Sequence, residues 1–104
     1  MFDLKPISIS PKAVEEIRKI MEKKGIPADY GLRIGVRGSG CGVSPIIGFD
    51  KQKETDLTYT INSIPVFVDK RHTMYIIGKE VDFYEGADGR GFTFADQKAP
   101  STTV

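Results

Sequence analysis

The clearest pattern of hydrophobic and polar positions lies near the amino end of the chain. Apolar side chains recur there at helical spacing, at Ala13, Val14, Ile17, Ile20 and Met21. Ser10 is a good N-cap, and Pro11 suits the first helical position because its missing N–H would have no partner there. Gly25, followed by Pro27, is a stop signal. The pattern predicts one amphipathic helix of about four turns.

Most of the remaining chain alternates with the period of β-strands. This period predicts strands at 32–36, 46–49, 57–61, 64–68, 81–83 and 92–94. Asn62 and Ser63 form a predicted turn, and residues 86–91 form another. Residues 72–77 are predicted as a short helix or a bent connection, closed by Gly78. We therefore expect an α+β, mostly β domain of mixed strands, with an N-terminal amphipathic helix and a short second helix.

Length and composition are consistent with one small domain. The chain has 104 residues, of which 39% are hydrophobic and 28% are charged. We place the domain at residues 1–96, and we expect the polar segment 97–104 to be a mobile tail. A domain this short buries only about two-thirds of its unfolded surface, so oligomerisation would be a natural way to gain stability.

Charge and cysteine content narrow the class of protein. A formal net charge of +1 gives no support for a general nucleic-acid-binding surface. The amino end lacks a signal-peptide pattern, and no apolar run approaches the roughly 20 residues that span a bilayer. A single cysteine excludes an intramolecular disulfide. We expect a soluble protein of a reducing cytoplasm that does not act at a membrane.

The single cysteine, Cys41, lies in the glycine-rich stretch GVRGSGCGVS at residues 35–44. Backbone N–H groups of such a loop can bind a phosphate. However, the chain lacks GxxxxGK[ST], and the residues after Cys41 resemble a strand, so no helix N-terminus faces an anion there. As an enzyme nucleophile, Cys41 would need a base, and His72 is the only histidine. No third residue that would orient His72 is apparent.

A third hypothesis makes Cys41 a ligand of a metal or a cluster. A thiolate between glycines is sterically open, and glycine N–H groups can donate to cluster sulfurs. One cysteine per chain cannot supply four thiolates, so such a site must recruit ligands from another subunit, a small thiol or a partner protein. The remaining alternative is that Cys41 is a small buried hydrophobic residue. The loop alone leaves these alternatives open.

The order of short motifs over the chain resembles a known family. The motifs are ISPKA (9–13), LRIGV (32–36), the Cys41 loop, IPVFVD (64–69), YIIGKEVDF (75–83) and GFTF (91–94). Together they resemble the A-type iron–sulfur carriers, the HesB/IscA/SufA-like family, over residues 7–102. The resemblance implies a compact HesB-like fold and a homodimer or homotetramer. It also implies a carrier, not an enzyme, that receives iron or an iron–sulfur cluster from assembly proteins and passes it to apo-clients.

The resemblance also implies a ligand set, from which this sequence departs. In the family the ligands are a cysteine in a Gly-Cys-Ser-Gly loop, which maps onto Cys41, and a Cys-Gly-Cys near the carboxyl end. Here Thr103 stands where the first tail cysteine is expected, and the sequence ends before the second. The loop reads Gly-Cys-Gly-Val and lacks the serine. A threonine hydroxyl does not replace a thiolate, because these clusters favour soft anionic sulfur.

Two hypotheses of different class follow. In the first, Cys41 thiolates from two or more protomers share iron or a cluster. In the second, the protein is a degenerate family member that acts through protein contacts without metal. His72 and Glu85 are candidate auxiliary ligands, although Glu85 reads more simply as a solvated turn carboxylate. Aromatic side chains are expected to pack in the core or at an interface, namely Phe49, Tyr59, Phe67, Tyr75, Phe83, Phe92 and Phe94.

Overall fold

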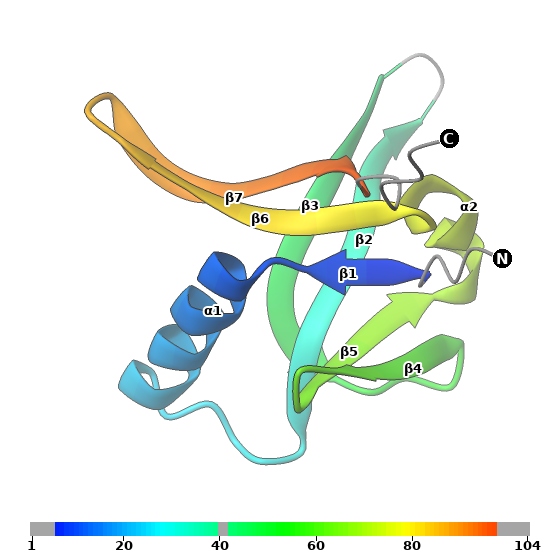
Figure 1. The fold of residues 1–104 in the computed structure, drawn as a ribbon. Helices are drawn as coiled ribbons and strands as arrows, with labels where there is room; N and C mark the ends of the chain where they lie inside the picture. The colour runs from blue at the N-terminus through cyan, green and yellow to red at the C-terminus, as the bar shows by residue number, and fades with distance from the viewer. Residues whose placement is uncertain (1–5, 40–41, 98–104) are drawn as a thin grey trace, which may run out of the picture.

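Two β-sheets and a long helix make up the described part of the protein (Figure 1). The computed structural model describes residues 6–39 and 42–97. In chain order the elements are β1 (Ile7–Ile9), α1 (Pro11–Lys23), β2 (Tyr30–Ser39), β3 (Gly42–Lys51), β4 (Asp56–Ile61), β5 (Ile64–Asp69), the 3-10 helix η1 (Lys70–His72), α2 (Thr73–Ile76), β6 (Lys79–Gly86) and β7 (Gly89–Asp96). The predicted mostly-β fold is confirmed, and residues 72–76 of the segment 72–77 belong to two short helices.

The two sheets mix parallel and antiparallel pairs. The three-stranded sheet has the order β1-β6-β7, with β1 parallel to β6. The four-stranded sheet has the order β3-β2-β5-β4. Its parallel pair, β2 and β5, is short and joins only Leu32 to Val66 and Arg33 to Phe67. The alternation in the sequence predicted every strand except β1, whose three residues are too few to show a period.

The helix α1 forms as its sequence signals predict. The Ser10 side chain accepts a hydrogen bond from the Ala13 N–H over 3.2 Å, as an N-cap does, and Pro11 is the first helical residue. Ser10 also donates to the Asp82 carboxylate over 2.6 Å, which ties the start of α1 to β6. Gly25 follows the helix with a φ of +60°, a conformation that glycine adopts at no steric cost.

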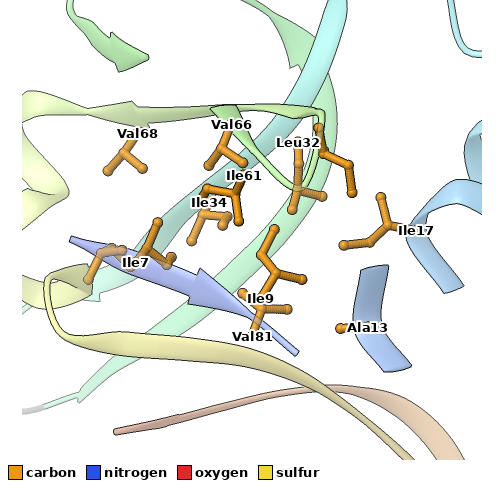
Figure 2. Packing of buried hydrophobic residues seen from close by; sticks show 12 residues of the cluster. Ile7, Ile9, Ala13, Ile17, Leu32, Ile34, Ile61, Val66, Val68 and Val81 are labelled. Atoms are coloured by element: carbon orange, nitrogen blue, oxygen red, sulfur yellow. The ribbon is translucent and has the colours of Figure 1, made fainter. Parts of the chain in front are cut away.

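The hydrophobic core lies between the two sheets and beside α1. Figure 2 shows Ile7, Ile9 and Val81 from the three-stranded sheet near Ile34 and Val66 from the four-stranded sheet. Ala13 and Ile17, two residues of the predicted apolar stripe, contribute the helix face. Burial of this kind is worth roughly 25 cal/mol per Å² of apolar surface, so the core is the main stabilising contribution.

The turn between β4 and β5 confirms a second sequence signal. Ile61 pairs with Ile64, so Asn62 and Ser63 are the two turn residues. Both have positive φ angles, 50° and 67°, as a two-residue hairpin turn of the favoured hand requires. Asparagine tolerates this conformation better than most residues, which is why the Asn62–Ser63 pair predicted a turn.

Gln97, the last residue that the structure describes, is bound to the residue before β6. The Gln97 N–H donates to the Gly78 carbonyl over 2.8 Å, so the chain is attached at Gln97. The rest of the predicted tail, 98–104, lies outside the described residues. Within the described ranges, no helix is long and apolar enough to cross a membrane.

Candidate functional site

A long β-hairpin carries the glycine-rich stretch. The antiparallel pair β2–β3 runs from Tyr30 opposite Lys51 to Ser39 opposite Gly42. Gly40 and Cys41 stand in the sequence between the last paired residues, and both lie outside the described part of the structure. Figure 1 shows β2 and β3 side by side up to this point. The two strands predicted on either side of Cys41, 32–36 and 46–49, therefore both form, and the structure pairs them as a hairpin.

Two positions of the stretch, 35 and 38, require glycine for different physical reasons. Gly38 has a φ of +107°, a left-handed conformation that residues with a side chain rarely adopt. Gly35 has no positive φ. A Cβ atom placed on Gly35 would instead lie 2.8 Å from Nδ1 of His72, inside van der Waals contact. Gly35 is therefore needed because the imidazole lies against the β2 backbone.

His72, the candidate auxiliary ligand, uses one ring nitrogen to bind the strand. The Val36 N–H donates to His72 Nδ1 over 3.3 Å. Since a backbone N–H can only donate, Nδ1 must be unprotonated, and the neutral ring then carries its proton on Nε2. In this arrangement neither nitrogen offers a free lone pair to a metal. The structure therefore gives His72 a structural partner in β2 in place of a ligand role.

Charged side chains surround the exposed side of the His72 ring. A pocket of about 250 Å³ is lined by His72 together with Arg33, Lys53, Asp69 and Arg71. Arg71 donates to the Asp69 carboxylate over 2.8 Å and holds the pKa of Asp69 well below its ordinary value. Arg33 likewise lowers the pKa of Asp56. These acids and bases neutralise each other, which explains a polar pocket without a free acidic cluster.

Glu85, the other candidate ligand, belongs to a different network. Its carboxylate lies 3.2 Å from Lys12 Nζ of α1 and 3.6 Å from Arg90 Nε of β7. The hydrogen bond from Lys12 is the main reason why the pKa of Glu85 is lowered. Glu85 is thus a surface ion-pair partner and does not join His72. Within residues 6–39 and 42–97, no three His, Cys, Asp or Glu side chains come together as a metal site.

The aromatic residues, predicted to pack in the core or at an interface, divide between buried and exposed positions, and the interface part of the prediction stays a prediction. Phe67 is buried, and Phe83 and Phe92 make an edge-to-face contact with ring centroids 5.0 Å apart. Tyr75, however, is 50% exposed on α2 and is not a core residue. It lines a pocket of about 300 Å³ with Val36, Pro45, Lys79 and Phe94. This pocket places Tyr75 of α2 beside the half of the β2–β3 hairpin that lies nearer Ser39 and Gly42.

Sequence reasoning missed the contact between His72 and Val36. A signal was present, because Gly35 is the one glycine within the predicted strand 32–36. A glycine within a strand often marks a close approach of another group. Which group approaches could not be read from the pattern, since His72 lies 37 positions further along the chain.

Comparisons with known proteins place this geometry in a family. A family model described as iron–sulphur cluster biosynthesis matches residues 5–103. An iron-binding protein IscA from Yersinia enterocolitica is 32% identical over 97 residues, which cover 91% of this chain and 89% of that protein. A putative iron–sulfur cluster insertion protein ErpA from Ralstonia pickettii is 29% identical over 99 residues, covering 93% of this chain and 79% of that protein.

A solved structure agrees with the sequence comparisons. The crystal structure of Escherichia coli SufA, described as involved in biosynthesis of iron–sulfur clusters, aligns with a TM-score of 0.74 at 27% identity. The alignment covers 99% of this chain and 90% of that chain. The expected fold is thereby confirmed.

Proposed function

This chain belongs to the iron–sulphur cluster biosynthesis family, and from that premise we propose that it carries iron or an iron–sulfur cluster through Cys41. Its relatives include an iron-binding protein and a cluster insertion protein. The observation that carries the proposal is the match of the family model over residues 5–103, which includes the Cys41 hairpin. The protein acts as a carrier and not as an enzyme.

The ligand count requires more than one molecule. Each chain has one cysteine, whereas iron–sulfur clusters are held by sets of thiolates, commonly four. Cys41 thiolates from two or more protomers therefore share the cargo, with further ligands from a small thiol or a partner. The protein works as a homodimer or homotetramer in the cytoplasm. A cargo held by so few thiolates favours delivery to apo-clients over storage.

A second candidate function is a role through protein contacts without metal. The observation that favours it is a run of exposed apolar residues on and after α2. Met74, Tyr75 and Ile77 are 79%, 50% and 57% exposed. Three large exposed apolar side chains within four positions are a candidate interaction surface, because contiguous apolar patches mark interaction sites. In this alternative Cys41 is a remnant of the family pattern.

Anaerobic reconstitution with iron and sulfide separates the two functions. The visible absorption of the wild type is compared with that of Cys41→Ser, and the mass of each loaded species is measured by light scattering. We expect a brown wild type that contains one cluster per two or more chains, and a pale variant. A colourless wild type, or equal colour in both proteins, would show that Cys41 holds no cargo and would favour the contact role.

A further inference from the structure

The side of β2 that faces β5 loses its strand partner after Arg33. The parallel pairing of β2 and β5 ends at Arg33 opposite Phe67, whereas β2 continues to Ser39. From Ile34 onward, no residue of β2 has a register partner in β5 in the described structure, whereas the pairing with β3 continues to Ser39. The chain that follows β5 enters η1 and α2, and α2 packs against β2. The helical segment thus takes the place that a longer β5 would have held.

His72 provides the hydrogen bond that the missing strand would have made. The Val36 N–H points away from β3, because it donates to His72 Nδ1 over 3.3 Å. Pro45, which is opposite Val36, has no N–H to give to β2, so this pair is of the non-hydrogen-bonded kind. Val36 therefore has its hydrogen-bond partner on the helical side.

Gly35 shows that the ring is built into this position. The Cβ that Gly35 lacks would lie 2.8 Å from His72 Nδ1 and 3.5 Å from Cε1. The imidazole therefore lies directly over the backbone of β2 at this residue. Since the φ of Gly35 does not require glycine, the close approach of the ring does. Two independent features, a hydrogen bond and a missing side chain, converge on the same contact.

We propose that His72 is a positioning residue that holds the outer part of β2, the strand that leads to Cys41, only while its imidazole is neutral. Among the described residues, the Val36–His72 bond is the hydrogen bond nearest to Cys41 in sequence that joins the hairpin to another element. A doubly protonated imidazole has no acceptor, so its Nδ1–H would face the Val36 N–H and the bond would be lost. At this level, β2 would then be hydrogen-bonded to β3 alone.

The charged neighbours of the ring come from several elements. Arg33 of β2, Lys53 between β3 and β4, Asp69 of β5 and Arg71 of η1 line the same pocket, and β3 adds only Ile46. The Asp69 carboxylate is taken up by Arg71 and by Thr55 at 3.2 Å. No carboxylate in this set is hydrogen-bonded to the imidazole, so the Val36 N–H is the partner that fixes its tautomer.

Protonation of the imidazole removes the acceptor that the Val36 N–H uses, so the contact exists only in the neutral form. Its relevance to cluster delivery rests on the proposed function. The hydrogen bond and its pH dependence do not, and they can be measured in the metal-free protein. A failure of iron loading would therefore leave this inference intact. A Val36 amide that does not respond to pH would likewise leave the proposed carrier function intact.

Amide hydrogen exchange by NMR tests the hydrogen bond directly. We expect the protection factor of the Val36 amide to fall about fivefold to tenfold between about pH 8 and about pH 5 in the wild type. His72→Asn keeps an acceptor but does not titrate, so its Val36 protection should not change with pH. His72→Phe should lack the protection at both pH values. Lys70→Ala, an exposed neighbour in η1, should behave as the wild type does.

The same NMR spectra provide reference amides and identify the ring nitrogen of His72 that carries the proton. In an antiparallel ladder the Gly35 and Arg37 amides face β3, so their protection should stay constant. The ring ¹⁵N shifts at about pH 8 should report a proton on Nε2. A proton on Nδ1, or Val36 protection that ignores pH in the wild type, overturns the inference. If His72→Phe does not fold, the wild-type titration and His72→Asn decide.

A nitroxide on Cys41 tests whether the contact between His72 and Val36 positions the end of the hairpin that carries Cys41. Because the chain has one cysteine, the label is site-specific. Its mobility should rise at about pH 5 in the wild type and stay constant in His72→Asn. If the Val36 amide responds to pH and the label does not, the hydrogen bond exists but positions nothing at Cys41, and the positioning role is wrong.

Discussion

The Arg33 guanidinium binds the Asp56 carboxylate through two hydrogen bonds, from Nη1 to Oδ1 at 2.7 Å and from Nη2 to Oδ2 at 2.6 Å. The Asp56 side chain is fully buried, and that of Arg33 is 17% exposed. Asp56 also accepts from the Lys53 N–H over 2.7 Å, and Arg33 Nε donates to Asp50 over 3.0 Å. One buried pair therefore joins β2, β3 and the start of β4, in the half of the hairpin that lies nearer Tyr30 and Lys51.

We expect Asp56→Asn to lower the free energy of unfolding by about 3 kcal/mol, the lower end of the cost of breaking a buried ion pair. The loss is at this end because Arg33 keeps Asp50 as a partner. Urea unfolding followed by circular dichroism measures it. The control is Asp29→Asn, because that carboxylate is exposed and lies 3.8 Å from Lys51. Equal losses in both variants would contradict the assigned role of the pair.

The same pair makes a prediction about acid. Arg33 is the main cause of the lowered pKa of Asp56 in the folded state. A carboxyl whose folded pKa is lowered stabilises the protein above its unfolded pKa and stops doing so as pH falls through the folded value. The free energy of unfolding should therefore decrease below about pH 4, and more steeply in the wild type than in Asp56→Asn. Parallel curves for the two proteins would contradict this.

Gly35→Ala should destabilise the protein by about 1–3 kcal/mol, as overpacking does, since the added Cβ would force the His72 ring from Val36. Gly48→Ala in β3 is the matched control, because a Cβ there meets nothing within 4 Å. Thermal unfolding of Gly35→Ala, His72→Ala and the double variant Gly35→Ala/His72→Ala gives the coupling energy between the two residues. The double variant should lose less than the sum of the single losses. Strict additivity would mean that the two residues do not interact.

The sequence contained most of the fold, because its signals were local. The helix has its cap, stripe and stop within residues 10–25, and the strands show their period within five or six positions. Asn62 and Ser63 carry their own turn chemistry. The strands on either side of Cys41 were predicted for the same reason, whereas their pairing was not. The family resemblance, and not the pattern, supplied the iron–sulfur hypothesis.

What could not be predicted depends on residues far apart in the chain. The pairing of Arg33 with Asp56 and the contact of His72 with Gly35 follow from the order of strands and from the early end of the β2–β5 ladder. Glu16 is similar, since the helical pattern places a polar residue at a buried position without naming its partner. Alternation specifies which face a side chain occupies and not which element covers it.

Glu16 itself gives a further stability prediction. Its carboxylate accepts from Arg90 of β7 over 3.0 Å and from Lys19 over 3.3 Å, with 8% of the side chain exposed. We expect Glu16→Gln to cost about 1 kcal/mol, since a neutral acceptor makes weaker bonds than a charged one. Glu22→Gln, an exposed change on the same helix, should cost less than half of that. Chemical denaturation in urea, which does not screen charge, measures both.

Adding a thiolate tests whether ligand shortage limits cargo retention. The family resemblance expects a cysteine where Thr103 stands, and position 103 lies outside the described residues. If too few thiolates hold the cargo, Thr103→Cys should slow the loss of iron–sulfur absorbance to a chelator at least several-fold, because each added thiolate is a better ligand than a hydroxyl. Glu22→Cys, which adds a thiol on the exposed face of α1, is the matched control and should leave the rate unchanged. Equal slowing in both variants would indicate scavenging by any added thiol, and no slowing in Thr103→Cys would mean that the ligand set is completed by something other than a tail thiolate.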